Sequence, residues 1–139
     1  MILLDTCALI WLVAGDLDES PAAADIESAA RESAVLVSTV SAGEIGLLTR
    51  KRPNAPPRLE LAPDPKTWFS QLLAQPRIRL AGLTPGIAID ASHLPGELHG
   101  DPADRLLVAT ARHYGVPVVT RDRRILSYAR DGFVGAIAC

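Results

Sequence analysis

Four acidic residues stand where the chain changes from one kind of segment to the next. Asp5 ends an apolar run at the N-terminus, and Asp122 follows another near the C-terminus. Glu44 follows a β-branched apolar segment, and Asp104 lies in the first turn of a predicted helix. Carboxylates about 4 Å apart repel by roughly 4 kcal/mol per pair at an effective dielectric near 20. If these four converge, the cluster therefore needs protons or cations.

The oxygen atoms of such a cluster determine which ions it binds. Sets of oxygen ligands suit Mg²⁺ and Mn²⁺, which keep several waters and accept phosphate oxygens as further ligands. A bound ion lowers the pKa of its water, holds a scissile phosphate and stabilises the leaving oxygen, and two ions would divide these tasks. The predicted chemistry is phosphoester cleavage, with either one ion or two.

Each acid also has a purely structural interpretation. Asp5 and Asp122 are placed to cap the segments that follow them, and Glu44 is placed to close a capping box with the serine three residues before it. Asp101 is placed as an N-cap, which leaves Asp104 at the third helical position, where a carboxylate complements the helix dipole. Taken singly, each acid fits a cap as well as it fits a catalytic role.

No other motif points to a different chemistry. The sequence has no G-x-S-x-G elbow and no Walker-type phosphate loop. His93, His99 and His113 lack a paired metal-ligand spacing and are interpreted as surface or structural residues, although His99 lies beside the acidic segment. Cys7 and Cys139 lie near opposite ends of the chain and are interpreted as reduced thiols.

The segments around these residues alternate between strand and helix patterns. Short apolar or β-branched runs predict strands, and apolar residues at helical spacing predict helices between them. Such alternation predicts one α/β domain over residues 1–139, with a central parallel sheet and helices on both faces. Ligands bind beyond the carboxyl ends of the strands in such sheets, which is where the acids are expected. The predicted strands are 1–4, 34–39, 78–83, 116–120 and 133–137. The predicted helices are 8–13, 20–33, 41–48, 68–74, 84–94 and 101–111.

Composition agrees with a single domain. The chain has 139 residues, of which 48% are hydrophobic and only 4% aromatic, so the core must be mainly aliphatic. Five prolines between Lys51 and Lys66 exclude a continuous helix and predict an exposed connection inside the domain. The net charge of -2 argues against a general nucleic-acid coat. No apolar run approaches the length of a membrane span and no signal peptide begins the chain, so we expect a cytoplasmic protein.

Four stretches of the sequence carry a family resemblance that covers nearly the whole chain. They are Leu4-Asp5-Thr6, Ser41-Ala-Gly-Glu44-Ile45, the block from His99 to Leu107, and Val119-Thr120-Arg121-Asp122. With these the chain resembles PIN-domain ribonucleases, specifically the VapC-like toxins of bacterial toxin–antitoxin pairs. The resemblance implies a compact α/β fold, dependence on Mg²⁺ or Mn²⁺, endonucleolytic cleavage of RNA, a homodimer, and inhibition by a cognate antitoxin protein.

The resemblance also ranks the candidate residues. The positions that match the acidic quartet of the family are Asp5, Glu44, Asp104 and Asp122. Asp5 and Asp104 are the first choices for metal ligands, with Asp122 as a direct or water-mediated ligand, while Glu44 binds metal or orients the attacking water. Asp101 matches a further acid of this toxin subgroup, and Thr6 and Thr120 match hydroxyl positions close to the site.

An acidic pocket repels RNA, so contacts with phosphates must come from cations on its rim. The first candidates adjoin the acids and are Arg105, Arg121, Arg123 and Arg124. A second candidate is the cluster Arg50-Lys51-Arg52, which follows the predicted helix of Glu44. Solvated charges at helix ends are the alternative interpretation of both groups.

Two other functions compete with a nuclease. One is a catalytically silent PIN-like module that binds RNA or an antitoxin, and the intact quartet argues against it. The other is a Mg-dependent, receiver-like phosphotransfer domain, which normally needs a lysine near its acids. Lys51 and Lys66 are the only lysines in the chain, and both lie in or beside the proline-rich connection.

Overall fold

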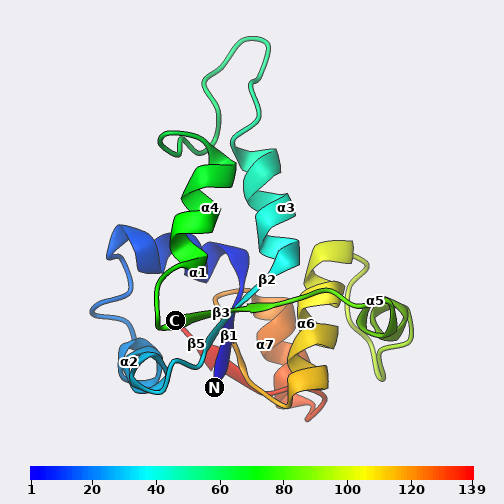
Figure 1. The fold of residues 1–139 in the computed structure, drawn as a ribbon. Helices are drawn as coiled ribbons and strands as arrows, with labels where there is room; N and C mark the ends of the chain where they lie inside the picture. Colours follow the sequence, from blue (N-terminus) through cyan, green and yellow to red (C-terminus); the bar gives the residue numbers. More distant parts are fainter.

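The computed structural model describes residues 1–139 as one layered α/β domain (Figure 1). Its five strands form a sheet in the order β3-β2-β1-β4-β5, and every neighbouring pair is parallel. This confirms the predicted fold class. The strands are β1 (Ile2–Leu4), β2 (Val35–Ser38), β3 (Ile78–Ala81), β4 (Val118–Thr120) and β5 (Ala136–Ala138).

Helices cover both faces of the sheet, as predicted. Leu4 of β1 belongs to an apolar cluster with Leu9 and Ile26 on one face, whereas the adjacent Leu3 belongs to a cluster with Leu107 on the other. Successive side chains of a strand point to opposite faces, so β1 contributes to both layers of the core. The helices are α1 (Thr6–Ala14), α2 (Ala23–Arg31), α3 (Thr39–Leu48), α4 (Pro65–Leu73), α5 (Pro85–Ser92), α6 (Pro102–Tyr114) and α7 (Arg123–Arg130).

Three predicted N-caps are confirmed. The side chain of Asp5 accepts a hydrogen bond from the backbone N–H of Ala8 at the start of α1, and Asp101 accepts one from Asp104 at the start of α6. Asp122 caps α7, a full helix where the sequence indicated only a turn. Each cap is an aspartate in extended conformation, the geometry that presents a carboxylate to the first free N–H groups of a helix.

Two other predicted helix starts are wrong. Ser41 and Glu44 do not form a capping box, because α3 begins earlier, at Thr39, with Ser38 as its N-cap. Ser38 ends strand β2 and its hydroxyl accepts from the N–H of Val40, so the chain enters the helix directly from the sheet. Helix α2 begins at Ala23, with no side-chain cap, rather than at the Ser20-Pro21 pair.

The last strand begins at Ala136, three residues after its predicted start at Phe133. Gly132 adopts a positive φ of 90°, which turns the chain after α7. Phe133 then stacks on Tyr128, and Val134 packs against the core from a loop. The apolar character of these two residues therefore reflects packing outside the sheet.

Residues 49–64 connect α3 and α4, which project together from the sheet with the connection at their far end (Figure 1). Most of these residues are exposed, and a single antiparallel bridge joins Arg52 and Ala55. This confirms an exposed connection within the domain. None of the helices has the length and apolar character that a membrane crossing requires.

Candidate active site

The four predicted acids approach the site from different elements. Asp5 directly follows β1, and Asp122 lies two residues after the neighbouring strand β4. Asp104 lies in the first turn of α6. Glu44 differs from its predicted place after a strand, because it lies in the second turn of α3. The parallel strands end at the same edge of the sheet, so this edge is the site.

The electrostatics of Asp104 report that the acids converge. Burial raises the pKa of its carboxyl group from 3.8 to about 7, and neighbouring negative charges contribute to the increase. In decreasing order of effect, these neighbours are Asp101, Asp122, Glu44 and Asp5. Without a cation, the cluster therefore favours a proton on one of its members near neutral pH.

Asp5 is the most deeply placed acid, with 8% of its surface exposed. Burial raises the pKa of its carboxyl group, the Thr120 hydroxyl and the Ala8 N–H lower it by hydrogen bonding, and the charge of Asp122 raises it again. The oxygen of the buried Thr120 hydroxyl also accepts from the N–H of Asp122 at 3.0 Å. Thr120 thus connects two members of the cluster, which agrees with its predicted place close to the site.

The caps leave part of each carboxylate free. Oδ1 of Asp5 accepts from Ala8 at 2.7 Å, and Oδ1 of Asp122 accepts from Arg124 and Ile125 at 2.8 and 3.0 Å. In both residues these hydrogen bonds reach Oδ1 and not Oδ2. Because a carboxylate has two oxygens, capping a helix and binding a cation are compatible roles here.

Glu44 is positioned by a small hydroxyl network. Oγ1 of Thr6 lies 2.5 Å from Oε1 of Glu44 and 3.0 Å from Oγ of Ser41. Thr6 and Ser41 are both buried. Thr6 was expected near the site, but Ser41 was interpreted only as a helix cap. Its position three residues before Glu44 on α3 was the signal that the two side chains share one helical face.

His99 is the site residue that the sequence interpretation set aside. Its side chain is 11% exposed, and Nε2 lies 3.1 Å from Oδ2 of Asp104. The pair is not aligned as a hydrogen bond, and neither ring nitrogen has another partner. One ligand atom from each of His99, Asp104 and Asp122 lies within 4.8 Å of the other two. A divalent cation fits this group, because carboxylate oxygens and an unpartnered imidazole nitrogen face the same space.

The four predicted RNA-contacting arginines have different environments. Arg105 donates to the backbone carbonyls of Ala91 and Leu98 at 2.9 and 3.0 Å, so it braces the α5–α6 loop. Arg121 donates to the carbonyl of Cys139, and its guanidinium lies 4.0 Å from the centre of the Trp11 ring. Arg123 and Arg124 are exposed on the first turn of α7.

A second group of arginines borders the acidic site. A cavity of about 430 Å³ is lined at one end by Thr6, Cys7 and Glu44. The remaining lining residues are Leu47, Leu48, Arg50, Arg52 and Arg58. The cationic wall thus comes from the end of α3 and the proline-rich connection, and it includes two residues of the Arg50-Lys51-Arg52 cluster.

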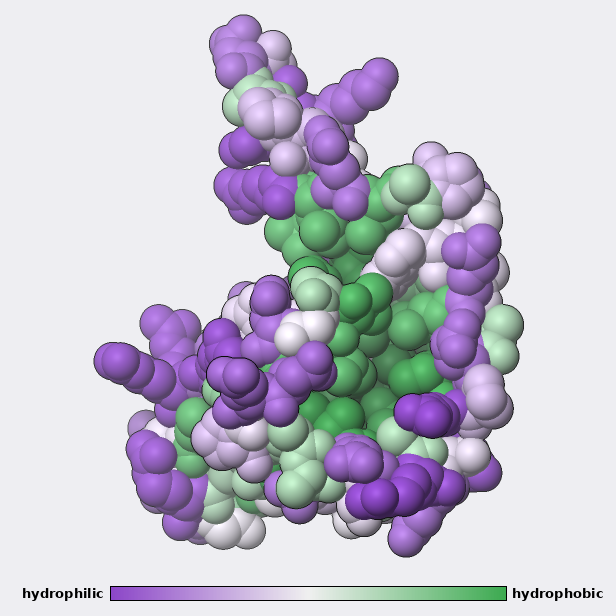
Figure 2. Space-filling view, turned by 90° about the vertical axis from the view of Figure 1, so that its left-hand side faces the viewer, coloured by the Kyte–Doolittle hydropathy of each residue, from purple (hydrophilic) through white to green (hydrophobic).

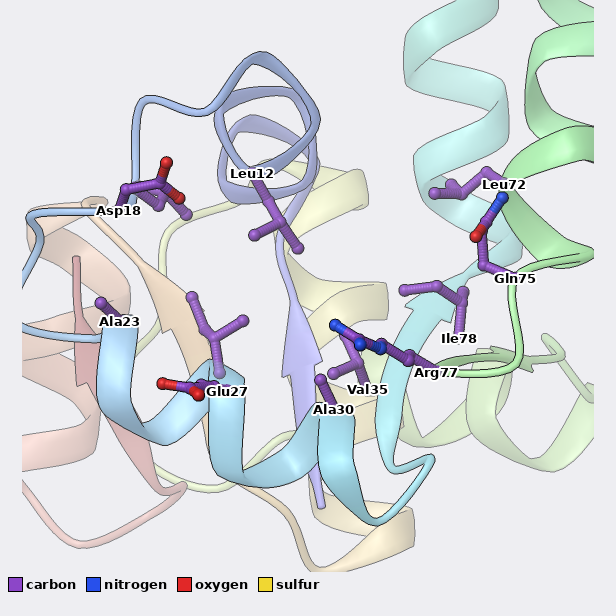
Figure 3. Close-up of a pocket in the computed structure, with 12 residues that line it drawn as sticks. Leu12, Asp18, Ala23, Glu27, Ala30, Val35, Leu72, Gln75, Arg77 and Ile78 are labelled. Carbon is purple, nitrogen blue, oxygen red and sulfur yellow. The ribbon is translucent and has the colours of Figure 1, made fainter.

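An apolar hollow of about 440 Å³ lies between α1, α2 and α4. Figure 2 shows that side of the molecule, where hydrophobic side chains gather in a depression with hydrophilic residues around it. In the close-up, Leu12 of α1, Ala30 of α2 and Leu72 of α4 point into the hollow (Figure 3). Asp18, Glu27 and Arg77 are among the polar residues of its lining.

Known proteins with similar sequences identify the family of the chain. The family model described as PIN domain matches residues 2–131. Ribonuclease VapC22 of Mycobacterium tuberculosis (strain ATCC 25618 / H37Rv) is 36% identical over 127 residues, which cover 91% of each chain. The family match spans the segments that carry the acidic cluster.

Solved structures share the fold. A chain of VapBC2 from Rickettsia felis, bound to a DNA fragment from its promoter, aligns with a TM-score of 0.66 at 14% identity and covers 99% of this chain and 98% of that one. A chain of FitAB bound to an IR36 DNA fragment aligns with a TM-score of 0.63 at 24% identity, covering 99% and 94%. FitAcB from Neisseria gonorrhoeae aligns with a TM-score of 0.60 at 23% identity, covering 99% of this chain and 96% of that one.

Proposed function

Because the chain belongs to the PIN-domain family, we propose that it is a metal-dependent endoribonuclease and the toxin of a toxin–antitoxin pair. The observation that carries this proposal is the convergence of four carboxylates from four separate segments, with a pKa of about 7 at Asp104. The 36% identity to a ribonuclease over most of both chains supports RNA as the substrate.

The carboxylates divide the work of holding the cation and the attacking water. Asp104 and Asp122 would offer oxygens to the ion, and Asp5, which is hydrogen-bonded to Thr120, stays a candidate ligand. When bound, Mg²⁺ or Mn²⁺ supplies an activated water and neutralises charge on the scissile phosphate. Glu44, held by Thr6, is the residue that we assign to orienting that water.

RNA reaches this centre along the cavity that leads from Glu44 to Arg50, Arg52 and Arg58. Guanidinium groups form bidentate hydrogen bonds to phosphates, so they can hold the RNA backbone while the acids bind the cation. Arg123 and Arg124 stay candidates for contacts on the other side of Asp122.

Cleavage of RNA by the purified chain tests the function. We expect cutting with Mg²⁺ or Mn²⁺ and none in excess chelator. The Asp104→Asn variant should fold and lose cutting, whereas Asp90→Asn, an exposed change on α5, should keep it. Undiminished cutting in chelator, or in Asp104→Asn, would contradict the metal mechanism. A folded wild type that binds RNA without cutting it would favour the catalytically silent alternative.

We further propose that a cognate antitoxin protein covers the apolar hollow between α1, α2 and α4. An apolar depression with a charged rim is the kind of surface that protein partners bury. The Ala30→Glu variant places a charge in the hollow and should escape neutralisation while it still cleaves RNA. Ala24→Glu, on the exposed side of the same helix, is the matched control.

Growth of a bacterial host measures that neutralisation. Expression of the chain should arrest growth unless a neighbouring small gene is expressed with it. Rescue of the Ala30→Glu variant as complete as that of wild type would contradict the proposed surface.

A homodimer is a separate proposal, supported by exposed apolar side chains such as Leu80 on the edge strand β3 and Ile89 on α5. Light scattering of the purified chain tests it.

A further inference from the structure

The loop between α5 and α6 holds His99 in a defined place. Arg105 donates to the carbonyl of Leu98 at 3.0 Å, and the Tyr128 hydroxyl donates to the carbonyl of Pro95. Leu98 also packs against the apolar cluster that contains Tyr128. These contacts come from α6 and α7, so the position of His99 is set by the core rather than by the loop alone.

The ring of His99 has one polar contact within the chain, between Nε2 and Oδ2 of Asp104 at 3.1 Å, and this contact lacks hydrogen-bond alignment. Both nitrogens are shielded from solvent and neither forms a hydrogen bond. Buried polar groups of folded proteins are nearly always paired, and an unpaired one indicates that a ligand, water or ion completes it. The ring faces Asp104 and Asp122, so the missing partner lies among the carboxylates.

The spacing of the ligand atoms indicates a cation. Nε2 of His99 lies 3.1 Å from Oδ2 of Asp104 without the alignment of a hydrogen bond. In an octahedral site with bonds of about 2.1 Å, adjacent ligands lie about 3 Å apart and opposite ligands about 4.2 Å apart. The ligand atoms of His99, Asp104 and Asp122 all lie within 4.8 Å of one another, close to the separations of ligands around one ion.

We propose that His99 is a direct nitrogen ligand of the divalent cation, together with Asp104 and Asp122. The part of this cation in RNA cleavage rests on the proposed function, but the ligand set rests on the geometry alone. Imidazole binds first-row transition ions better than it binds Mg²⁺, which prefers oxygen. The site should therefore select Mn²⁺ over Mg²⁺ more strongly than a set of carboxylates alone would.

Pulsed electron paramagnetic resonance of the full chain with bound Mn²⁺ tests the ligand directly. Wild type should show coupling of Mn²⁺ to an imidazole nitrogen, and the coupling should change to that of ¹⁵N when histidine alone is labelled. His99→Phe keeps a planar ring without nitrogen and should lose the coupling. His113→Phe, an exposed change on α6, should keep it. No nitrogen coupling in wild type would overturn the proposal, even if His99→Phe failed to fold.

Titration of the same proteins with each ion gives a second readout. We expect His99→Phe to bind Mn²⁺ at least about tenfold more weakly, with a smaller loss for Mg²⁺. Equal losses for the two ions would contradict a nitrogen ligand. Nitrogen coupling in a protein that does not cleave RNA would support the ligand and contradict the proposed function. Cleavage without the coupling would contradict the ligand alone.

Discussion

At the scale of single residues, the carboxylates of this site serve the fold and the cation at once. Oδ1 of Asp5 and Oδ1 of Asp122 cap helices, which fixes the direction of Oδ2. Because the cap holds the side chain in one conformation, little further ordering is needed when a ligand binds. The cost falls on Asp104, where burial first and the repulsion of neighbouring carboxylates second raise the pKa.

The raised pKa of Asp104, caused first by burial and then by repulsion, predicts how the metal-free protein responds to pH. The pKa of Asp104 is about 7 in the folded protein, against an ordinary value of 3.8. A raised pKa means that the folded state binds the proton more tightly, so this contribution to stability is complete below pH 3.8 and is lost as the pH rises through about 7. Urea denaturation in chelator should show a falling free energy of unfolding between about pH 4 and 7, the interval between the two pKa values. Asp104→Asn should flatten that slope and Asp90→Asn should keep it; equal slopes in wild type and Asp104→Asn would refute the prediction.

The contact between the Thr6 hydroxyl and Glu44 predicts that Thr6 contributes to catalysis by positioning the Glu44 carboxylate. Thr6→Val keeps the shape of the buried side chain and removes the contact with Glu44. We expect kcat to fall by about 10- to 100-fold, as for other residues that orient the groups around a metal. Thr6→Ser should restore most of the rate. Steady-state kinetics on a short RNA measures both, and equal rates for the two variants would show that the hydroxyl has no such role.

At the scale of elements, the α3–α4 connection carries both the irregular backbone and the cationic wall. Its prolines keep it out of helix, and its arginines project beside the end of α3. The connection thus links the fold to substrate binding, because the same segment that cannot form a helix borders the cavity next to Glu44.

Replacing Arg50, Arg52 and Arg58 by alanine should weaken RNA binding and reduce its dependence on salt. Each phosphate contact with a single strand contributes about 0.7 to the slope of log K against log salt. Losing three contacts should therefore lower the slope by about 2.1, with kcat at saturating RNA little changed. Binding measured with Ca²⁺ in place of the catalytic ion gives the slope. Arg79→Ala, exposed on β3, is the control, and a triple variant with the slope of this control would exclude the connection from the RNA path.

At the scale of the whole molecule, the proposed cation would join elements from both ends of the chain. Asp104 belongs to α6 and Asp122 to α7, while Asp5 follows the central strand. A ligand that binds only the folded state stabilises it in proportion to the logarithm of its concentration. Metal binding should therefore be visible in global unfolding.

Thermal unfolding measures this linkage. At a Mn²⁺ concentration one hundred times Kd, the free energy of unfolding should increase by about 2.7 kcal/mol. This corresponds to a rise in Tm of roughly 8 °C for a domain of this size. Asp122→Asn keeps a cap acceptor and should lose most of the rise, whereas Asp131→Asn, an exposed change at the end of α7, should not. A full rise in Asp122→Asn would remove this residue from the ligands.

The sequence by itself determined the alternating elements, the parallel sheet and the aspartates at helix starts, because periodicity and capping act over a few neighbouring residues. It did not determine the start of α3, where the strand-ending Ser38 caps the helix in place of Ser41. Only the tertiary structure decided that His99 lies beside Asp104 and that Arg58 lines the same cavity as Glu44. Such contacts join segments far apart in the chain, and they depend on strand order and on the hydrogen bonds from Arg105 and Tyr128 to the α5–α6 loop, which no local pattern encodes.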